Sequence, residues 1–313
     1  MPAVKQVMPQ AFQDPEILRQ LLAQAEPFVV RQAAAVPPEL YQQMLRQFQS
    51  HQLTLFNVSH SKASGGIENF HSLFEAIERL RAGSASGADP QALWQEYQAT
   101  VGKYLLPSQS LNTQQHFSVQ LDIQAGSALS RRLIEPITTA YARCLHPITR
   151  RLYLNTVVNI SRGHSELAYR SRNLHAHNYD TFTTFVSAGP ETAVYLFTPS
   201  FYRQFRARAV PTQPGILLFF PEREAVSDPL FEQALVHVNV QPGDIIYTPP
   251  MWFHCFHHQG EYMNIANGEF LPDWLPARLP AVNAETFGAD AALIAQHMRS
   301  LQQFALRGGP KNL

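Results

Sequence analysis

The hydrophobic pattern in the first third of the chain has the period of α-helices. Asp14 precedes Pro15 and the run EILRQLLAQA, which places a capping side chain and then a proline at the start of a helix. The same spacing of apolar residues predicts further helices that start near Pro37 and Asp89 and that cover Ile67–Gly83 and roughly Gly126–Leu145.

The pattern changes after Pro147 to short runs of β-branched and aromatic residues. Pro, Gly, Asn and Ser separate these runs, and this spacing is typical of a sandwich or barrel. The runs are RLYLNTVVNI, DTFTTFVSA, ETAVYLFT, GILLFF, LVHVNV and DIIYTPP. After Phe270 the chain becomes rich in proline and closes with the helical run AETFGADAALIAQHMRSLQQFAL.

These patterns predict a mainly β protein with flanking helices, in the α+β class. We divide it into a mostly helical N-terminal region over 1–112, a β core over 113–270 and a C-terminal helical extension over 271–313. The last helix either caps the core or pairs two subunits into a homodimer.

Composition narrows the class of protein. The 313 residues are 45% apolar and 15% charged, which indicates a folded chain. Lys+Arg and Asp+Glu number 24 each, so no global field favours nucleic acid. Cys144 and Cys255 cannot form a disulfide framework and point to a reducing compartment. Without a signal peptide or an apolar run of ~18 residues, we expect a cytoplasmic protein with no membrane contact.

Two histidines in the run NLHAHNYDTFTTF suggest a metal site. His175 and His177 are two apart, so on a strand they project to the same face. Two imidazoles within reach of each other suit a transition metal. Asp180 points the other way on a regular strand, but a bulge or turn at residues 178–179 would bring its carboxylate to the same ion.

A third histidine follows a rigid strand exit in PGDIIYTPPMWFHCFHH. Pro249 and Pro250 end the strand, and Trp252 and Phe253 supply a hydrophobic wall directly before His254. His257 and His258 come later and are predicted to be peripheral. A barrel brings distant strands side by side, so His177 and His254 are predicted to share one metal ion.

This segment resembles the second metal motif of the cupins. Gly243, Pro249 and His254 match the motif, whereas Met251 stands in place of a glycine and His258 in place of an asparagine. The order PGD, hydrophobic run, Pro, Trp-x-His is closer still to the JmjC-like, cupin-like (type 8) oxygenases, which include the factor-inhibiting asparaginyl hydroxylase. EPFVVRQ and YMNIANGEF resemble the first and last strands of that family, so the resemblance covers roughly residues 26–270.

The resemblance implies a double-stranded β-helix (jelly roll, cupin) core and a non-haem Fe(II)- and 2-oxoglutarate-dependent oxygenase. Such an enzyme would use dioxygen to hydroxylate a C–H bond of a peptide side chain or a small metabolite. By analogy, His177, Asp180 and His254 are the metal ligands and catalytic residues. The family's H-x-D is one residue shorter than His177-Asn-Tyr-Asp180, so a three-histidine site with His175 is the alternative.

The resemblance also suggests side chains for the cosubstrate. The family's lysine for 2-oxoglutarate falls near Thr192, where no lysine stands. Arg203, Arg206 and Arg208 are either substitutes for it, because a guanidinium binds carboxylate, or plain surface residues. The other candidates for a polar pocket are Thr184, Tyr195 and Asn267.

Two further functions stay open at this level. One is a cupin-type metal-dependent oxygenase that acts on a small chelating substrate without 2-oxoglutarate, which the missing lysine and the unusual spacing favour. The other is a non-catalytic jelly roll that binds a partner.

Overall fold

A computed structural model gives the positions of most of the β core and of the segments 4–43 and 261–307. It describes residues 4–43, 54–62, 66–67, 116–122, 130–145, 150–162, 174–189, 192–213, 215–222, 225–226, 229, 236–258 and 261–307. Of the helix predicted over Ile67–Gly83, the structure describes only Ile67, which ends a short strand; the helix after Asp89 lies outside the described residues, as does the helix from Pro37 beyond residue 43.

The N-terminal segment alternates short strands and helices. Its elements are β1 (Lys5–Val7), α1 (Pro9–Phe12), α2 (Pro15–Ala23) and β2 (Phe28–Val30). The carboxylate of Asp14 accepts hydrogen bonds from the backbone N–H groups of Glu16 and Ile17, at 2.8 and 3.2 Å. This capping confirms the helix start that the Asp-Pro pair predicted.

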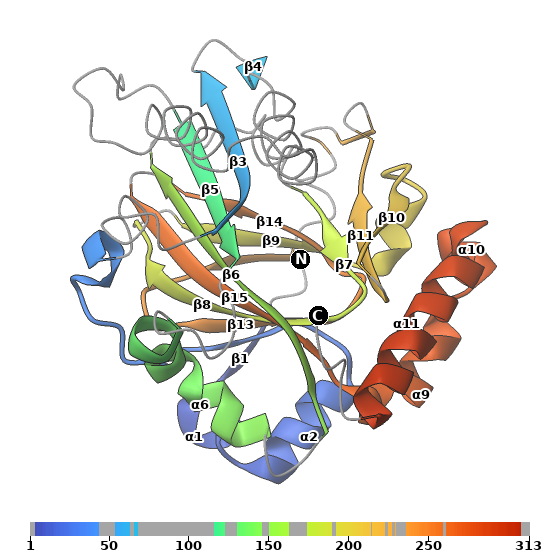
Figure 1. The fold of residues 1–313 in the computed structure, drawn as a ribbon, viewed down its shortest axis with the longest axis horizontal. Helices are drawn as coiled ribbons and strands as arrows, with labels where there is room; N and C mark the ends of the chain where they lie inside the picture. The colour runs from blue at the N-terminus through green and yellow to red at the C-terminus, as the bar shows by residue number, and fades with distance from the viewer. Residues whose placement is uncertain are drawn as a thin grey trace, which may run out of the picture.

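One sheet forms the larger layer of the molecule (Figure 1). Its strands run in the order β1-β2-β13-β8-β15-β6-β5-β3-β4. The strands not yet bounded are β3 (Thr54–Lys62), β4 (Gly66–Ile67), β5 (His116–Asp122), β6 (Leu152–Arg162), β8 (Asp180–Ser187), β13 (Ile245–Thr248) and β15 (Tyr262–Phe270). The sequence did not predict β3, because its polar composition, TLFNVSHSK, lacks a clear two-residue alternation.

Two smaller sheets form the facing layer. Their orders are β12-β9-β14 and β10-β11-β7. The bounds are β7 (Ala176–His177), β9 (Ala193–Phe197), β10 (Arg208–Gln213), β11 (Ile216–Phe220), β12 (Val236–Asn239) and β14 (Phe253–His257). A single antiparallel bridge between His175 and His254 joins the two smaller sheets.

The chain alternates between the two layers from β6 to β9 and from β12 to β15, whereas β9 to β12 follow one another in the facing layer. β6, β8, β13 and β15 lie in the larger sheet, whereas β7, β9, β12 and β14 lie in the facing layer. This alternation is what a double-stranded β-helix requires, and the mainly β class with helices agrees with the prediction. The extra strands β1, β2, β3 and β4 show that residues before 113 also contribute to the sheet.

Buried apolar residues form three clusters that fix which way each strand faces. One cluster lies between the layers and includes Phe185, Leu196 and Phe256. A second lies on the outer side of the larger sheet, where Phe182 packs against the helices α1, α2 and α6 (Glu135–Leu145). A third covers the outer side of the smaller sheets and includes Phe253. Alternate residues of one strand therefore enter different clusters.

The C-terminal segment runs from the outer side of the larger sheet, where Trp274 and Arg278 pack, to the outer side of the smaller sheets, where Phe287 packs. It contains η4 (Pro272–Trp274), α9 (Leu275–Arg278), η5 (Leu279–Ala281), α10 (Ala284–Phe287) and α11 (Asp290–Leu306). Gly288 separates the last two helices with a φ of 59°, so the single helix that the sequence predicted is broken there. Ile294, Met298 and Leu301 of α11 are fully buried in the third cluster.

Two other helical features complete the described chain. A π-helical turn, η1 (Ser130–Ile134), precedes α6, and together they cover the helix predicted over roughly Gly126–Leu145 from residue 130 on, whereas 126–129 lie outside the described residues. A 3-10 turn, η2 (Pro199–Tyr202), follows β9. In the part of the chain that the structure describes, the helices are too short or too polar to cross a lipid bilayer.

Candidate metal centre

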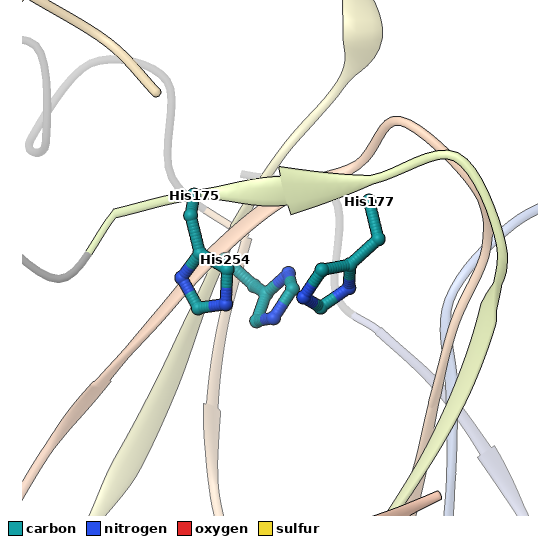
Figure 2. A group of neighbouring side chains, drawn as sticks. All are labelled: His175, His177 and His254. Atoms are coloured by element: carbon teal, nitrogen blue, oxygen red, sulfur yellow. The ribbon is translucent and has the colours of Figure 1, made fainter. Parts of the chain in front are cut away.

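Three histidine side chains from two neighbouring strands point toward one another (Figure 2). His175 and His177 project from the same side of β7, and the ring of His254 on β14 lies between them in this view. One ring nitrogen from each histidine can be chosen so that all three lie within 4.8 Å of one another. The ring centroids are 4.5 to 4.9 Å apart. We call this set the histidine triad.

Backbone hydrogen bonds hold the two strands of the triad in register. The N–H of His254 donates to the carbonyl of His175 at 2.8 Å, and the N–H of His175 donates back to His254 at 3.2 Å. The N–H of Met251 donates to the carbonyl of His177 at 2.5 Å. These bonds place the three side chains together before any ion binds, which favours tight metal binding.

A second contact orients each of two rings. The Nδ1–H of His254 donates to the carbonyl of Trp252 at 3.1 Å, because a carbonyl oxygen can only accept. His177 Nδ1 lies 3.3 Å from the hydroxyl of Thr181. Each contact occupies Nδ1 and leaves Nε2 of the same ring for a metal ion.

Electrostatics keep these rings in the form that binds metal. Burial lowers the pKa of His177 well below its usual value, and the adjacent His175 and His254 lower it further. Burial and the nearby His175 lower the pKa of His254 to about 3, against a small opposing effect of its bond to Trp252. Both imidazoles are therefore neutral near pH 7, and a neutral nitrogen is the one that carries a free lone pair.

The turn that follows His177 packs closely around it. The ring of Tyr179 stacks on His177 with centroids 4.6 Å apart and an angle of 13° between the rings. Gly268 on β15 lies beneath this turn, where a Cβ would come within 2.8 Å of the Tyr179 ring and would also collide with the side chain of Asn155. A glycine is therefore required for this close approach of β15.

Asp180 does not join the triad. Its side chain belongs to the row of β8 that contains Phe182, on the helix-covered outer side of the larger sheet. There its carboxylate oxygens bond Arg278 Nη1 at 2.7 Å and the hydroxyl of Tyr247 at 2.6 Å. No bulge turns it back toward the histidines, so in this structure His175 lies beside His177 and His254 whereas Asp180 does not.

The side chains that were predicted to bind a cosubstrate are dispersed. By strand register, Thr184 and Asn267 lie on the same outward-facing side of the larger sheet as Phe182. Tyr195 lies in the cluster outside the smaller sheets. Arg203 is exposed and donates to the carbonyl of Ala284. The structure therefore brings none of these four to the triad.

Thr192 and two arginines complete the set of predicted positions. Thr192 is fully buried directly before β9, and within the described part of the chain its hydroxyl has no hydrogen-bond partner. Arg206 and Arg208 are mostly exposed and pair with Glu222 at 3.5 and 3.1 Å. These two arginines are surface residues, which was one of the two interpretations that the sequence left open.

Sequence reasoning missed the two groups that orient the rings. The Thr181 hydroxyl and the Trp252 carbonyl carry no motif that would have identified them. Thr181 could have been found from its place on β8, because it lies on the inward-facing side, opposite to that of Asp180. A backbone carbonyl such as that of Trp252 carries no sequence signal at all.

Comparisons with known proteins give a fold-level likeness only. No protein-family model matches the chain, and no curated protein matches its sequence. A structure of Escherichia coli YcfD is similar at a TM-score of 0.43 with 15% identity, over 82% of this chain and 52% of that one. YcfD, described as a ribosomal oxygenase, in complex with cobalt and 2-oxoglutarate matches at 0.40 with 14% identity, over 78% and 48%. This chain thus spans about half the length of those proteins, and likeness this low carries no argument about its reaction.

Proposed function

We propose that this protein is a metal-dependent oxygenase in which His175, His177 and His254 hold a divalent transition metal. The observation that carries the proposal is the triad itself: three imidazoles from two strands, preassembled by backbone hydrogen bonds, with two of them held neutral by burial. Nitrogen donors of this kind suit Fe, Co, Ni, Cu or Zn rather than Mg or Ca. Iron(II) is the metal that the resemblance implies.

The chain's own residues supply binding, orientation and a dry environment. The contacts of Thr181 and Trp252 orient two of the rings. Phe256 and Leu196 lie in the apolar cluster on the side of the sheets that His254 faces, where they exclude water. Iron bound to the triad would supply the dioxygen chemistry that side chains lack. Three protein ligands leave further coordination positions open for substrate and dioxygen.

The ligand set favours a substrate that binds the metal directly. Three neutral imidazoles leave the full double positive charge of the ion in place, whereas a carboxylate ligand would remove half of it. A site that keeps this charge attracts a chelating anion. For this reason we favour the form of the function that does not use 2-oxoglutarate.

The residues around the predicted cosubstrate position also favour an oxygenase that does not use 2-oxoglutarate. The arginines proposed to bind the far carboxylate of 2-oxoglutarate are exposed, and two of them pair with Glu222. The position that the family fills with lysine holds Thr192. A 2-oxoglutarate-dependent oxygenase remains the second candidate, because the sequence resemblance to the JmjC-like family favours it.

Metal binding is the first test. We expect metal-free protein to bind one Co(II) or Fe(II) per chain under anaerobic conditions, measured by visible absorption and calorimetry. His254→Ala should lower the affinity by at least ~10-fold, whereas His257→Ala, which changes the outward-facing neighbour on β14, should not. A chain that binds neither ion would instead be a non-catalytic jelly roll.

The cosubstrate is the second test. Iron-loaded protein would be supplied with dioxygen and a panel of small chelating acids and diketones, with and without 2-oxoglutarate. We expect oxygen uptake that depends on the chelating compound and no release of succinate. Succinate formed in proportion to 2-oxoglutarate would overturn our choice and establish the second candidate.

A further inference from the structure

A buried charged network lies directly behind the candidate metal centre, on the other side of the larger sheet. Asp180 bonds both Arg278 and the hydroxyl of Tyr247, and Arg278 Nη2 also donates to that hydroxyl at 3.0 Å. The three side chains are at most 6% exposed. Burial raises the pKa of Tyr247, so its phenol keeps the proton that it donates to Asp180.

Burial of this network carries a large desolvation free energy. Removing a carboxylate and a guanidinium from water costs several kcal/mol per ion, and an apolar replacement is often at least as stable. Arg278 lies in α9, 98 residues after Asp180, so the ion pair joins the C-terminal segment to the first residue of β8. A network that contributes little to net stability is better explained by the position that it fixes.

The position that it fixes is the turn that carries His177. Thr181 follows Asp180 directly and places its hydroxyl 3.3 Å from His177 Nδ1. On the other side of the turn, the amide of Asn178 is held by the backbone of Gly215 and Leu217, at 2.8 and 2.9 Å. The turn is thus fixed at both of its sides, and Asp180 provides the fixed point nearest to Thr181.

We infer that Asp180, Arg278 and Tyr247 are positioning residues of the metal centre, which act on His177 through Thr181. The inference rests on the proposed function, because it requires that the triad binds a metal ion. It assigns Asp180 a role other than ligand. It also means that the C-terminal segment, through Arg278, helps to orient His177 in the metal centre.

The test compares Co(II) binding by four forms of the full chain. Asp180→Asn and Arg278→Gln each break the network. Asp244→Asn is the matched control, because Asp244 is also a buried carboxylate of the larger sheet, paired with Arg31 at 2.6 Å, at the end of β13 away from Thr181. Co(II) affinity, the visible spectrum of bound Co(II) and the thermal stability of the metal-free protein are measured for each form.

We expect both network variants to bind Co(II) at least ~10-fold more weakly, as loss of a partner that orients a ligand does, with an altered spectrum. Asp244→Asn should lose stability but keep the wild-type affinity and spectrum. Wild-type affinity in both network variants would overturn the inference and leave the proposed function intact. Weaker binding in Asp180→Asn alone, with unchanged or tighter binding in Arg278→Gln, would also overturn it, because Asp180 would then be a ligand.

Two further outcomes are covered by the same series. Wild-type protein that binds no Co(II) contradicts the proposed function itself. If Asp180→Asn and Arg278→Gln do not fold, Tyr247→Phe replaces them, since it removes a single hydroxyl. It is expected to lower Co(II) affinity several-fold, and an unchanged affinity and spectrum would refute the positioning role.

Discussion

At the scale of single residues, Glu269 is a carboxylic acid buried away from water. It is 1% exposed on β15, and one of its carboxylate oxygens has no hydrogen-bond partner among the residues that the structure describes. The other lies 3.6 Å from Arg151, too far for a strong ion pair. Burial raises the pKa of Glu269 to about 7, although Arg151 opposes the rise and Asp180 adds to it. The side chain therefore gains a proton near neutral pH.

This pKa predicts a pH dependence of stability. Between pH 4.5, its ordinary pKa, and about 7, the folded chain binds this proton more tightly than the unfolded chain. Stability from this group is therefore present at low pH and falls as pH rises to about 7, by about 3 kcal/mol in total. The free energy of urea unfolding should show this fall in the wild type relative to Glu269→Gln. Parallel pH profiles for the two proteins would contradict the assignment.

The histidine residues also mark how far sequence reasoning reaches. The i, i+2 spacing of His175 and His177 correctly predicted that they share a face, since strand alternation is local. The same rule placed Asp180 on the opposite face, and the alternative placement required a bulge or turn at residues 178–179 that the structure does not contain. Its buried partner Arg278 lies 98 residues away, so no local pattern could have predicted where the carboxylate binds.

At the scale of elements, the turn between β13 and β14 fixes the position of His254 relative to His177 in the histidine triad. Met251 adopts a φ of 67° in this turn, a left-handed conformation that favours glycine, and its side chain is 4% exposed. The conformation allows its N–H to reach the carbonyl of His177. The backbone strain at Met251 therefore lowers the stability of the folded chain, whereas the packing of its buried side chain raises it.

Because these two effects are opposite in sign, we predict that a glycine variant at position 251 is more stable than an alanine variant. Met251→Ala loses buried side-chain contacts, at a cost of about 2–5 kcal/mol, and keeps the strained backbone. Met251→Gly loses the same contacts but relieves about 1 kcal/mol of strain. We expect the glycine variant to unfold at the higher urea concentration of the two. The reverse order would indicate that the turn relaxes out of the left-handed region when the side chain is removed.

Strand predictions succeeded at this scale where runs are apolar. The runs that became β6, β8, β9, β11, β12 and β13 were all identified, because they are rich in β-branched and aromatic residues. Pairing partners were not predictable, because β15 lies between β6 and β8 and contacts residues more than 100 positions away. The joining of β7 to β14, which creates the triad, belongs to this non-local class.

At the scale of the whole molecule, α11 supplies one of the covers of the β core (Figure 1). Leu301 is fully buried, and its side chain lies within 3.0 Å of where a Cβ on Gly215 would be. The apolar face of α11 is therefore occupied within the chain. The homodimer suggested for this helix stays a prediction and would need its other face.

Removal of the packing contact of Leu301 with β11 should lower the stability of the folded chain. We expect Leu301→Ala to lower the free energy of unfolding by about 2–5 kcal/mol, since the cavity cannot collapse fully between the helix and β11. Gln302→Ala, the next residue on α11 but partly exposed, is the control and should change stability by less than about 0.5 kcal/mol. Equal effects would mean that α11 does not pack on the core in solution.

The place of β15 in the larger sheet has a consequence for synthesis on the ribosome. This strand is the last of the barrel to emerge, yet it fills the gap between β6 and β8. A nascent chain that ends before Tyr262 carries two open strand edges, which invite pairing with other chains. Arg278 emerges later still, so Asp180 cannot pair with this guanidinium until residue 278 has been synthesised. Such a protein should fold slowly and depend on chaperones during that interval.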